Sequence, residues 1–212
     1  MKNRTVTILA IGLLTLAGVI VCFVLTRHKT VPSSPGVVVF SSFSPSNTFR
    51  PNSWAAGANA HADWFVPDVS GRLDEIKIAI EPNFARRGVE HTAGNLDLFL
   101  AADENGFPGK TLEEFSREAY APGSPSPSLP LVFKSVTRPE LEAGTKYWLC
   151  AKGSGAGGWI WHFGDPAMLR NAAREGGPGK WMTAGDYCYS GAFSISVMTN
   201  RTLPEKADGT RK

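Results

Sequence analysis

The chain has 212 residues, 42% of them hydrophobic, which suits one domain of ordinary size with a short appendage. The formal net charge is +3, but residues 36–198 hold 14 basic and 17 acidic residues, so the positive excess lies at the two ends. A domain that binds nucleic acid is expected to present a basic face, and this composition therefore argues against nucleic acid as a partner.

The N-terminus carries an apolar segment without charged residues, "TVTILAIGLLTLAGVIVCFVLT" at 5–26. As an α-helix rising about 1.5 Å per residue, it spans the roughly 30 Å hydrocarbon layer of a membrane. A cleaved signal peptide has a shorter apolar region, of about 7–15 residues, and a cleavage site of small residues, neither of which fits this segment. We therefore expect residues 1–29 to form an uncleaved membrane anchor with one transmembrane helix. Cys22 is expected to be an ordinary residue of the span, because Val21 precedes it where lipoprotein signals carry Gly or Ala.

The orientation of this anchor is not set by charge, because two basic residues flank the span on each side. The strand-like body carries two cysteines far apart in sequence, Cys150 and Cys188, which favours an oxidising compartment. We expect a single-pass membrane protein with its domain extracytoplasmic, in the periplasm or at the cell surface. We also expect a Cys150–Cys188 disulfide, with two independently buried thiols as the alternative.

Beyond the anchor, residues 30–36, "TVPSSPG", have the composition of a short extended linker. The body at 37–198 has a hydrophobic period of two, as in half-buried strands, which places two sets of residues on inward faces: Ile76, Ile78 and Ile80, and Leu96, Leu98 and Leu100. Further short apolar segments, "LPLVFKSV", "TKYWLCAK", "GWIWHF" and "GAFSISVM", are separated by clusters rich in Gly, Pro and Ser. The tail at 199–212 is charged and is expected to be disordered.

One helix is expected in the body, at "DPAMLRNAAR", where Asp165 would cap the helix and Pro166 would occupy its first turn. Many short strands with a single short helix predict an all-β fold. We expect a jelly-roll-like antiparallel β-sandwich at 37–198, preceded by the N-terminal transmembrane helix.

Five stretches of the body, in order, are "VVVFSSFSPSNTF", "LDLFLAADENGFPGKTLEEF", "LEAGTKYWLCA", the tryptophan stretch "GGWIWHFGD" and "GAFSISV". Together they resemble the choice-of-anchor bacterial surface domains, in particular the R type, over about residues 37–198. The resemblance implies a compact β-sandwich of exported or surface proteins, attached by varied anchors and mostly of unknown function. This chain differs from that pattern in its N-terminal anchor, its two cysteines and the inserted "AMLRNAAREGGPGK".

Few residues are candidates for chemistry. Asp103, Glu104 and Asn105 offer oxygen ligands for calcium, but a calcium loop needs more acidic oxygens, so a hairpin turn at Asn105-Gly106 is expected. His61 lies near Asp63, and His91 near Glu90, without the spacing of a zinc site. We expect no cofactor, no metal and no catalytic residue, because the sequence shows neither a nucleophile elbow nor a cysteine in an obvious histidine-paired context.

The tryptophan stretch admits two interpretations. As a strand it places Trp159, Trp161 and Phe163 on one face, while Ile160 and His162 face the other way. That face suits either stacking on sugar rings or a sandwich core, and we favour the core, with His162 pointing outward and not catalytic.

The expected function is a membrane-anchored structural or protein-interaction module without catalysis, with an envelope protein as partner. The alternative is a carbohydrate-binding module that holds a glycan on surface aromatics, with Trp159, Trp161 and His162 as candidate ligand-binding residues.

Overall fold

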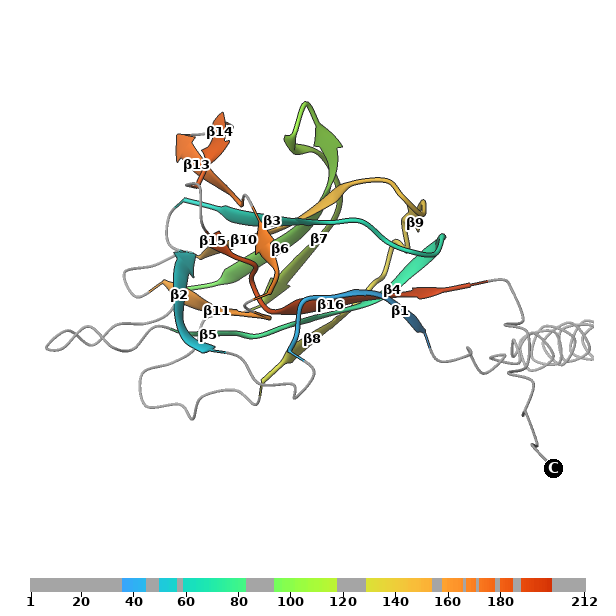
Figure 1. Cartoon of the computed structure of the whole chain (residues 1–212), viewed down its shortest axis with the longest axis horizontal. Helices are drawn as coiled ribbons and strands as arrows, with labels where there is room; N and C mark the ends of the chain where they lie inside the picture. The colour runs from blue at the N-terminus through green and yellow to red at the C-terminus, as the bar shows by residue number, and fades with distance from the viewer. Residues whose placement is uncertain are drawn as a thin grey trace, which may run out of the picture. The chain divides into compact units, whose positions relative to one another are not determined.

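The described part of the chain is built from antiparallel strands and contains no helix (Figure 1). The computed structural model describes residues 36–44, 50–56, 59–82, 94–117, 129–153, 158–165, 167–170, 172–177, 180–184 and 188–199, without the side chains at 50–56, 169–170 and 188–189. These residues all belong to one compact unit, Pro35–Lys212. The predicted span, linker and tail lie outside the described residues, apart from one residue of the linker and one of the tail.

Two larger sheets form the body. The five-stranded sheet has the order β1 (Val37–Ser41), β16 (Phe193–Met198), β4 (Gly71–Ile78) and β8 (Leu131–Lys134), with β9 (Glu140–Leu141) also paired to β4. The six-stranded sheet has the order β14 (Lys180–Thr183), β13 (Ala173–Gly177), β3 (His61–Phe65), β10 (Tyr147–Gly153), β6 (Leu96–Glu104) and β7 (Phe107–Arg117). Every pairing in both sheets is antiparallel.

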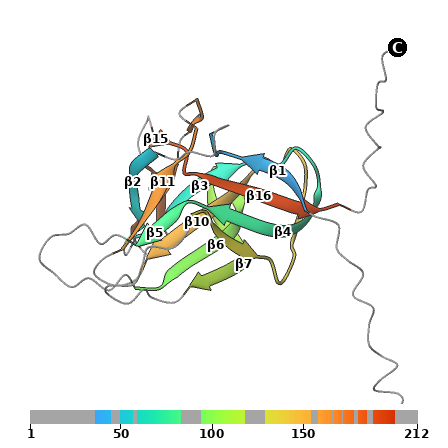
Figure 2. The same cartoon turned by 90° about the horizontal axis from the view of Figure 1, so that it is seen from below.

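Two smaller sheets complete the described strands. One has the order β2 (Arg50–Ala56), β11 (Trp159–Phe163) and β5 (Ile80–Pro82), and the other pairs β12 (Leu169–Arg170) with β15 (Cys188–Tyr189). Figure 2 looks onto the five-stranded sheet, where β16 lies between β1 and β4.

The main core lies between the two larger sheets, as in a β-sandwich. The alternation read from the sequence is confirmed on both layers, since the inward leucines of β6 and isoleucines of β4 are fully buried: Leu96, Leu98, Leu100, Ile76 and Ile78. The phenyl rings of Phe65 and Phe193 meet edge to face between the layers, with centroids 6.0 Å apart. Burial of these apolar side chains is the main stabilising contribution to such a fold.

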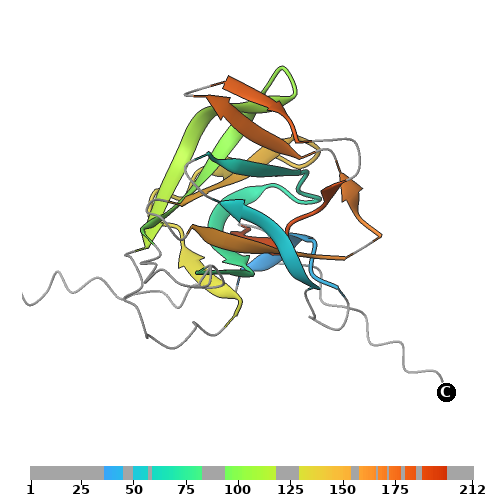
Figure 3. The same ribbon diagram turned by 90° about the vertical axis from the view of Figure 1, so that its left-hand side faces the viewer.

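A second, smaller core lies on the other face of the six-stranded sheet. The β13–β14 hairpin curls over that face, so that β14 comes close to β7 from the opposite edge of the same sheet (Figure 3). The hairpin and the sheet together bury four small residues and one tryptophan, with partly buried aromatic side chains packed around them. The buried residues are Ala62, Ala101, Trp148, Cys150 and Ala173, and the aromatic side chains around them are Trp64, Phe99, Phe107 and Trp181. This sheet therefore covers much of its outer face with its own hairpin.

The predicted helix at 165–174 is wrong. Asp165 does accept the backbone N–H of Ala167 through its carboxylate, at 2.9 Å, but this bond caps a turn. The chain then forms β12 and enters β13, where Ala173 pairs with Ala62 and is buried. Strand pairing with distant segments outweighs the local helix propensity of this stretch, because such propensities differ by less than about 1 kcal/mol per residue.

Gly191 joins the two larger sheets at the start of β16. Its N–H donates to the carboxylate of Asp63 on β3, at 2.8 Å, and its carbonyl accepts the hydroxyl of Ser42, next to β1, at 2.6 Å. A Cβ atom at Gly191 would lie 2.4 Å from Cε2 of Trp161, a distance that real Cβ atoms do not reach. Only glycine therefore lets the backbone approach this indole without a shift.

Ala192 bonds the three-stranded sheet, β2-β11-β5, to the same segment. Its N–H donates to the carbonyl of His162 on β11 at 2.7 Å, and its carbonyl accepts the N–H of Ala79, between β4 and β5, at 2.9 Å. The indole N–H of Trp161 also donates to this carbonyl, at 3.4 Å. We call residues 190–193 the junction segment.

We expect Trp161→Ala to lower the free energy of unfolding by about 3–5 kcal/mol, because loss of the buried indole leaves a cavity against the junction segment. Urea denaturation followed by far-ultraviolet circular dichroism measures this loss. Trp181→Ala is the matched control, since Trp181 is only partly buried on β14, and a smaller loss is expected there. Equal losses in the two variants would contradict the inference that Trp161 contributes more to the free energy of unfolding than a partly buried tryptophan does.

Candidate functional site

The tryptophan stretch forms β11, and its two indoles belong to the main core. Trp159 and Trp161 have exposed fractions of 0% and 2%, which confirms the core interpretation. Their ring N–H groups are also engaged inside the protein, Trp159 donating to the carbonyl of Gly94 at 3.0 Å. Neither indole presents a face to solvent, so a sugar-binding platform does not form at these two residues.

His162 lies on the face opposite the two indoles, as the alternation predicted, but it is buried and not exposed. Its exposed fraction is 6%, and both of its backbone groups are bonded, to Ala79 and Ala192. Its Nε2 lies 2.9 Å from Oε1 of Glu81 on β5. The expected exposure is wrong because β5 pairs with β11 and places Glu81 on the same face as Ile160 and His162, and the residue pattern does not reveal that neighbour.

The Asn105-Gly106 hairpin turn is confirmed. Both residues have positive φ, 55° and 85°, as the tight turn between β6 and β7 requires. The oxygens of Asp103 are engaged: one accepts the N–H of Gly106 at 3.2 Å, and the other accepts the Trp148 indole N–H at 2.7 Å and lies 3.2 Å from Nζ of Lys146. Asp103 therefore fixes the turn to the neighbouring strand β10.

The ammonium group of Lys146 lies above two indole rings on the outer face of the six-stranded sheet. It is 4.5 Å from the ring centroid of Trp148 and 5.2 Å from that of Trp64, distances typical of cation–π contacts. Burial acts to raise the pKa of Asp103, but the bonds from Trp148, Gly106 and Lys146 outweigh it and lower the pKa. The sequence analysis did not predict this aromatic group. It forms because "KYWLCA" pairs with "HADWF", which places Trp148 directly beside Trp64.

Asp63 bonds to the junction segment. The carboxylate of Asp63 is buried and accepts the hydroxyl of Ser190 and the N–H of Gly191 in the junction segment. Burial, with the nearby Arg174 guanidinium, lowers the pKa of His61. The pair His91 and Glu90 lies outside the described residues, and within the described ranges no group of His, Cys, Asp and Glu is arranged to hold a metal ion.

Glu113 is a buried carboxylate that the sequence analysis did not single out. From β7 it accepts the Ser135 hydroxyl at 2.6 Å and the N–H groups of Val136 and Thr137 at 2.6 and 3.0 Å. Burial acts to raise the pKa of Glu113, but these hydrogen bonds to the charged form outweigh it and lower the pKa. Glu113 thereby holds the loop that follows β8 against the edge of the other sheet.

Cys150 is a free thiol in the structure and is fully buried in the second core. Burial raises the pKa of this thiol well above its usual value, which makes it a poor nucleophile at neutral pH. The side chain of Cys188 lies outside the described residues, so the Cys150–Cys188 disulfide stays a prediction.

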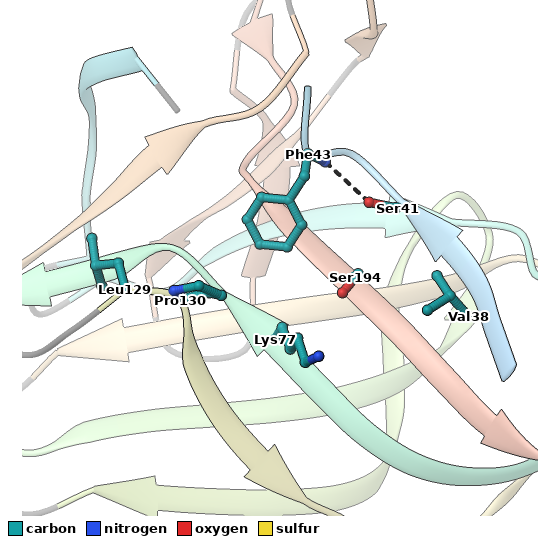
Figure 4. Close-up of a pocket in the computed structure, with 7 residues that line it drawn as sticks. All are labelled: Val38, Ser41, Phe43, Lys77, Leu129, Pro130 and Ser194. Atoms are coloured by element: carbon teal, nitrogen blue, oxygen red, sulfur yellow. Dashed lines mark hydrogen bonds between the residues drawn. The ribbon is translucent and has the colours of Figure 1, made fainter. Parts of the chain in front are cut away.

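A hollow of about 460 Å³ lies on the outer face of the five-stranded sheet (Figure 4). Residues from β1, β4 and β16 meet there with the segment that enters β8. The lining residues are Val38, Ser41, Phe43, Lys77, Leu129, Pro130 and Ser194. None of them was a candidate from the sequence, because their proximity depends on the strand order β1-β16-β4-β8.

No family model matches the chain, and no curated protein does. Among the described residues, no helix has the length and apolar character needed to cross a membrane. The predicted span at 5–26 lies outside those residues.

The bonds of Glu113 generate a pH-dependent prediction. Because the folded-state pKa lies below the ordinary value of about 4.5, the stabilisation is complete above that pH and is lost as pH falls through the folded-state pKa. Glu113→Gln should therefore lower the free energy of unfolding by about 1–3 kcal/mol at pH 7, and the difference from wild type should shrink in acid.

Denaturation midpoints measured from pH 7 to pH 3 test this dependence. Glu114→Gln is the matched control, because Glu114 is the next residue on β7 and is exposed. A Glu113→Gln deficit that stays constant over this range would show that the charge of Glu113 does not stabilise the loop.

Proposed function

We propose that this chain is a membrane-anchored module that displays a rigid β-sandwich outside the membrane for a structural or protein-interaction role, without catalysis. The described body is an antiparallel, sandwich-like all-β fold. We further propose that the sandwich is jelly-roll-like and related to the choice-of-anchor domains that the sequence resembles. The apolar segment at 5–26 supports the anchor, since its length suits one helical span.

The observation that supports the display role is that three carboxylates, two of them buried, each hold a loop or turn in place. Asp63 holds the junction segment, Asp103 the β6–β7 turn and Glu113 the loop after β8, each through several hydrogen bonds. The hydrogen bonds lower the pKa of Asp103 and of Glu113, and carboxylates whose oxygens are occupied in this way suit the fixing of loops better than proton transfer. Such fixed loops give the domain a constant surface for a partner.

Membrane fractionation tests the anchor. We expect the full-length protein to remain in the membrane pellet after an alkaline carbonate wash, and the double variant Leu13→Arg/Leu16→Arg to be released, because each central arginine costs about 2.5–3.5 kcal/mol on insertion. Leu203→Arg in the tail is the matched control and should stay in the pellet. Recovery of a soluble wild-type form that begins near residue 30 would show that the segment is a cleaved signal.

A membrane-impermeant amine label applied to cells stripped of their outer envelope, with the cytoplasmic membrane intact, tests the orientation of the domain. We expect exposed lysines of the body, such as Lys134, to be labelled before lysis. Labelling only after lysis would place the domain on the cytoplasmic side.

A further inference from the structure

We propose that the hollow over β16 is a binding site for a neutral sugar, which stacks on Phe43 and hydrogen-bonds to the hydroxyl of Ser194. This role goes beyond display of the domain, and it places sugar recognition on residues other than the buried tryptophans of β11. It rests on the shape, the hydrogen-bonding state and the charge of the hollow.

The shape of the hollow follows from small residues on a central strand. Ser194 lies on the outer face of β16, directly between Ser41 of β1 and Lys77 of β4 in the pairing register. Figure 4 shows Ser194 near the middle, with Phe43, Val38, Lys77 and the Leu129–Pro130 pair around it. Small side chains at the floor and larger ones around it leave a space of about 460 Å³, within the range of small-ligand sites.

The hydroxyl of Ser194 is the polar group available at this floor. Ser194 is 8% exposed, and among the described residues its side chain has no hydrogen-bond partner. The neighbouring hydroxyls differ, since Ser41 accepts the N–H of Phe43 at 3.3 Å and Ser196 donates to the carbonyl of Glu75 at 3.4 Å. A mostly buried hydroxyl that faces a hollow without a protein partner suits a ligand that brings its own hydroxyl groups.

The walls supply the apolar half of the site. Phe43 presents its ring beside Ser194, and Val38, 56% exposed, extends the apolar wall along β1. A pyranose has an apolar face of C–H groups and a rim of hydroxyls, so it matches an aromatic ring beside a hydroxyl floor. Stacking on the ring buries apolar area while the rim stays hydrogen-bonded.

The charges around the hollow favour a neutral ligand. The ammonium of Lys77 lies 3.2 Å from the carboxylate of Glu75, and Lys134 lies 2.7 Å from Glu75 and 3.6 Å from Asp74. Two positive and two negative groups therefore balance, and an anionic glycan would find no excess positive charge.

An extended peptide fits this floor less well than a sugar. Peptides that add to a sheet need unpaired backbone groups at an edge strand, whereas β16 is paired on both sides, with β1 and β4. The hollow offers side-chain groups at its floor, which is the chemistry of a small polar ligand.

Glycan screening of the full-length protein in mild detergent tests the site, on an array of neutral and anionic oligosaccharides. The best neutral ligand is then titrated against wild type and three variants. We expect Ser194→Ala and Phe43→Ala each to weaken binding at least about fivefold, as loss of a hydrogen bond or a stacking contact does. Ser196→Ala is the matched control, on the same strand and face but outside the hollow, and should bind as wild type does.

Thermal unfolding of each variant shows whether it is folded at the titration temperature, and Ser194→Ala carries the test if Phe43→Ala is unstable. The proposal is overturned if no neutral glycan binds, if only anionic glycans bind, or if folded Ser194→Ala binds as tightly as wild type. Membrane retention does not involve the hollow, so the proposed anchor and this site fail independently.

Discussion

The close approach of Gly191 to the Trp161 indole is the contact on which the arrangement of the sheets depends. Gly191 leaves no room for a side chain against this ring, and its backbone bonds to Asp63 and Ser42 from the two larger sheets. Ala192 then bonds to the three-stranded sheet through His162. Because these bonds lie at the start of β16, one short segment sets where the central strand of the five-stranded sheet begins. Packing that is both dense and hydrogen-bonded tolerates little change of volume.

The two outer faces of the sandwich differ in how they are covered. The six-stranded sheet curls its β13–β14 hairpin over its own face and buries Trp148 beneath Lys146. The five-stranded sheet keeps small serines on β16, and its face holds the hollow beside Phe43. One face thus adds stability, and the other offers the space in which a ligand fits.

The sequence was informative wherever local pattern decides structure. The alternation at Leu96–Leu98–Leu100 and the Asn105-Gly106 turn were both predicted, because burial of one strand face and positive φ each demand particular residue types. Burial of Trp159 and Trp161 was also favoured for its apolar area. These features need no knowledge of which strands pair.

The failures all depend on pairing between distant segments. The stretch from Asp165 has helix-like composition, yet Ala173 pairs with Ala62, more than a hundred residues away. His162 faces away from the two indoles and is nevertheless buried, because Glu81 of the paired strand β5 lies against it. The hollow exists only because β1 and β4 flank β16. A serine such as Ser194 looks like any outward residue of a strand until its neighbours are known.

Hydrogen exchange of the junction amides tests the central claim most directly. The N–H groups of Gly191, Ala192 and Phe193 are bonded to Asp63, His162 and Ser42, so they should exchange only when the whole domain unfolds. Their protection free energies should equal the global free energy of unfolding, while amides of the β13–β14 hairpin exchange by local opening. Junction amides that exchange as fast as those of the hairpin would contradict the account.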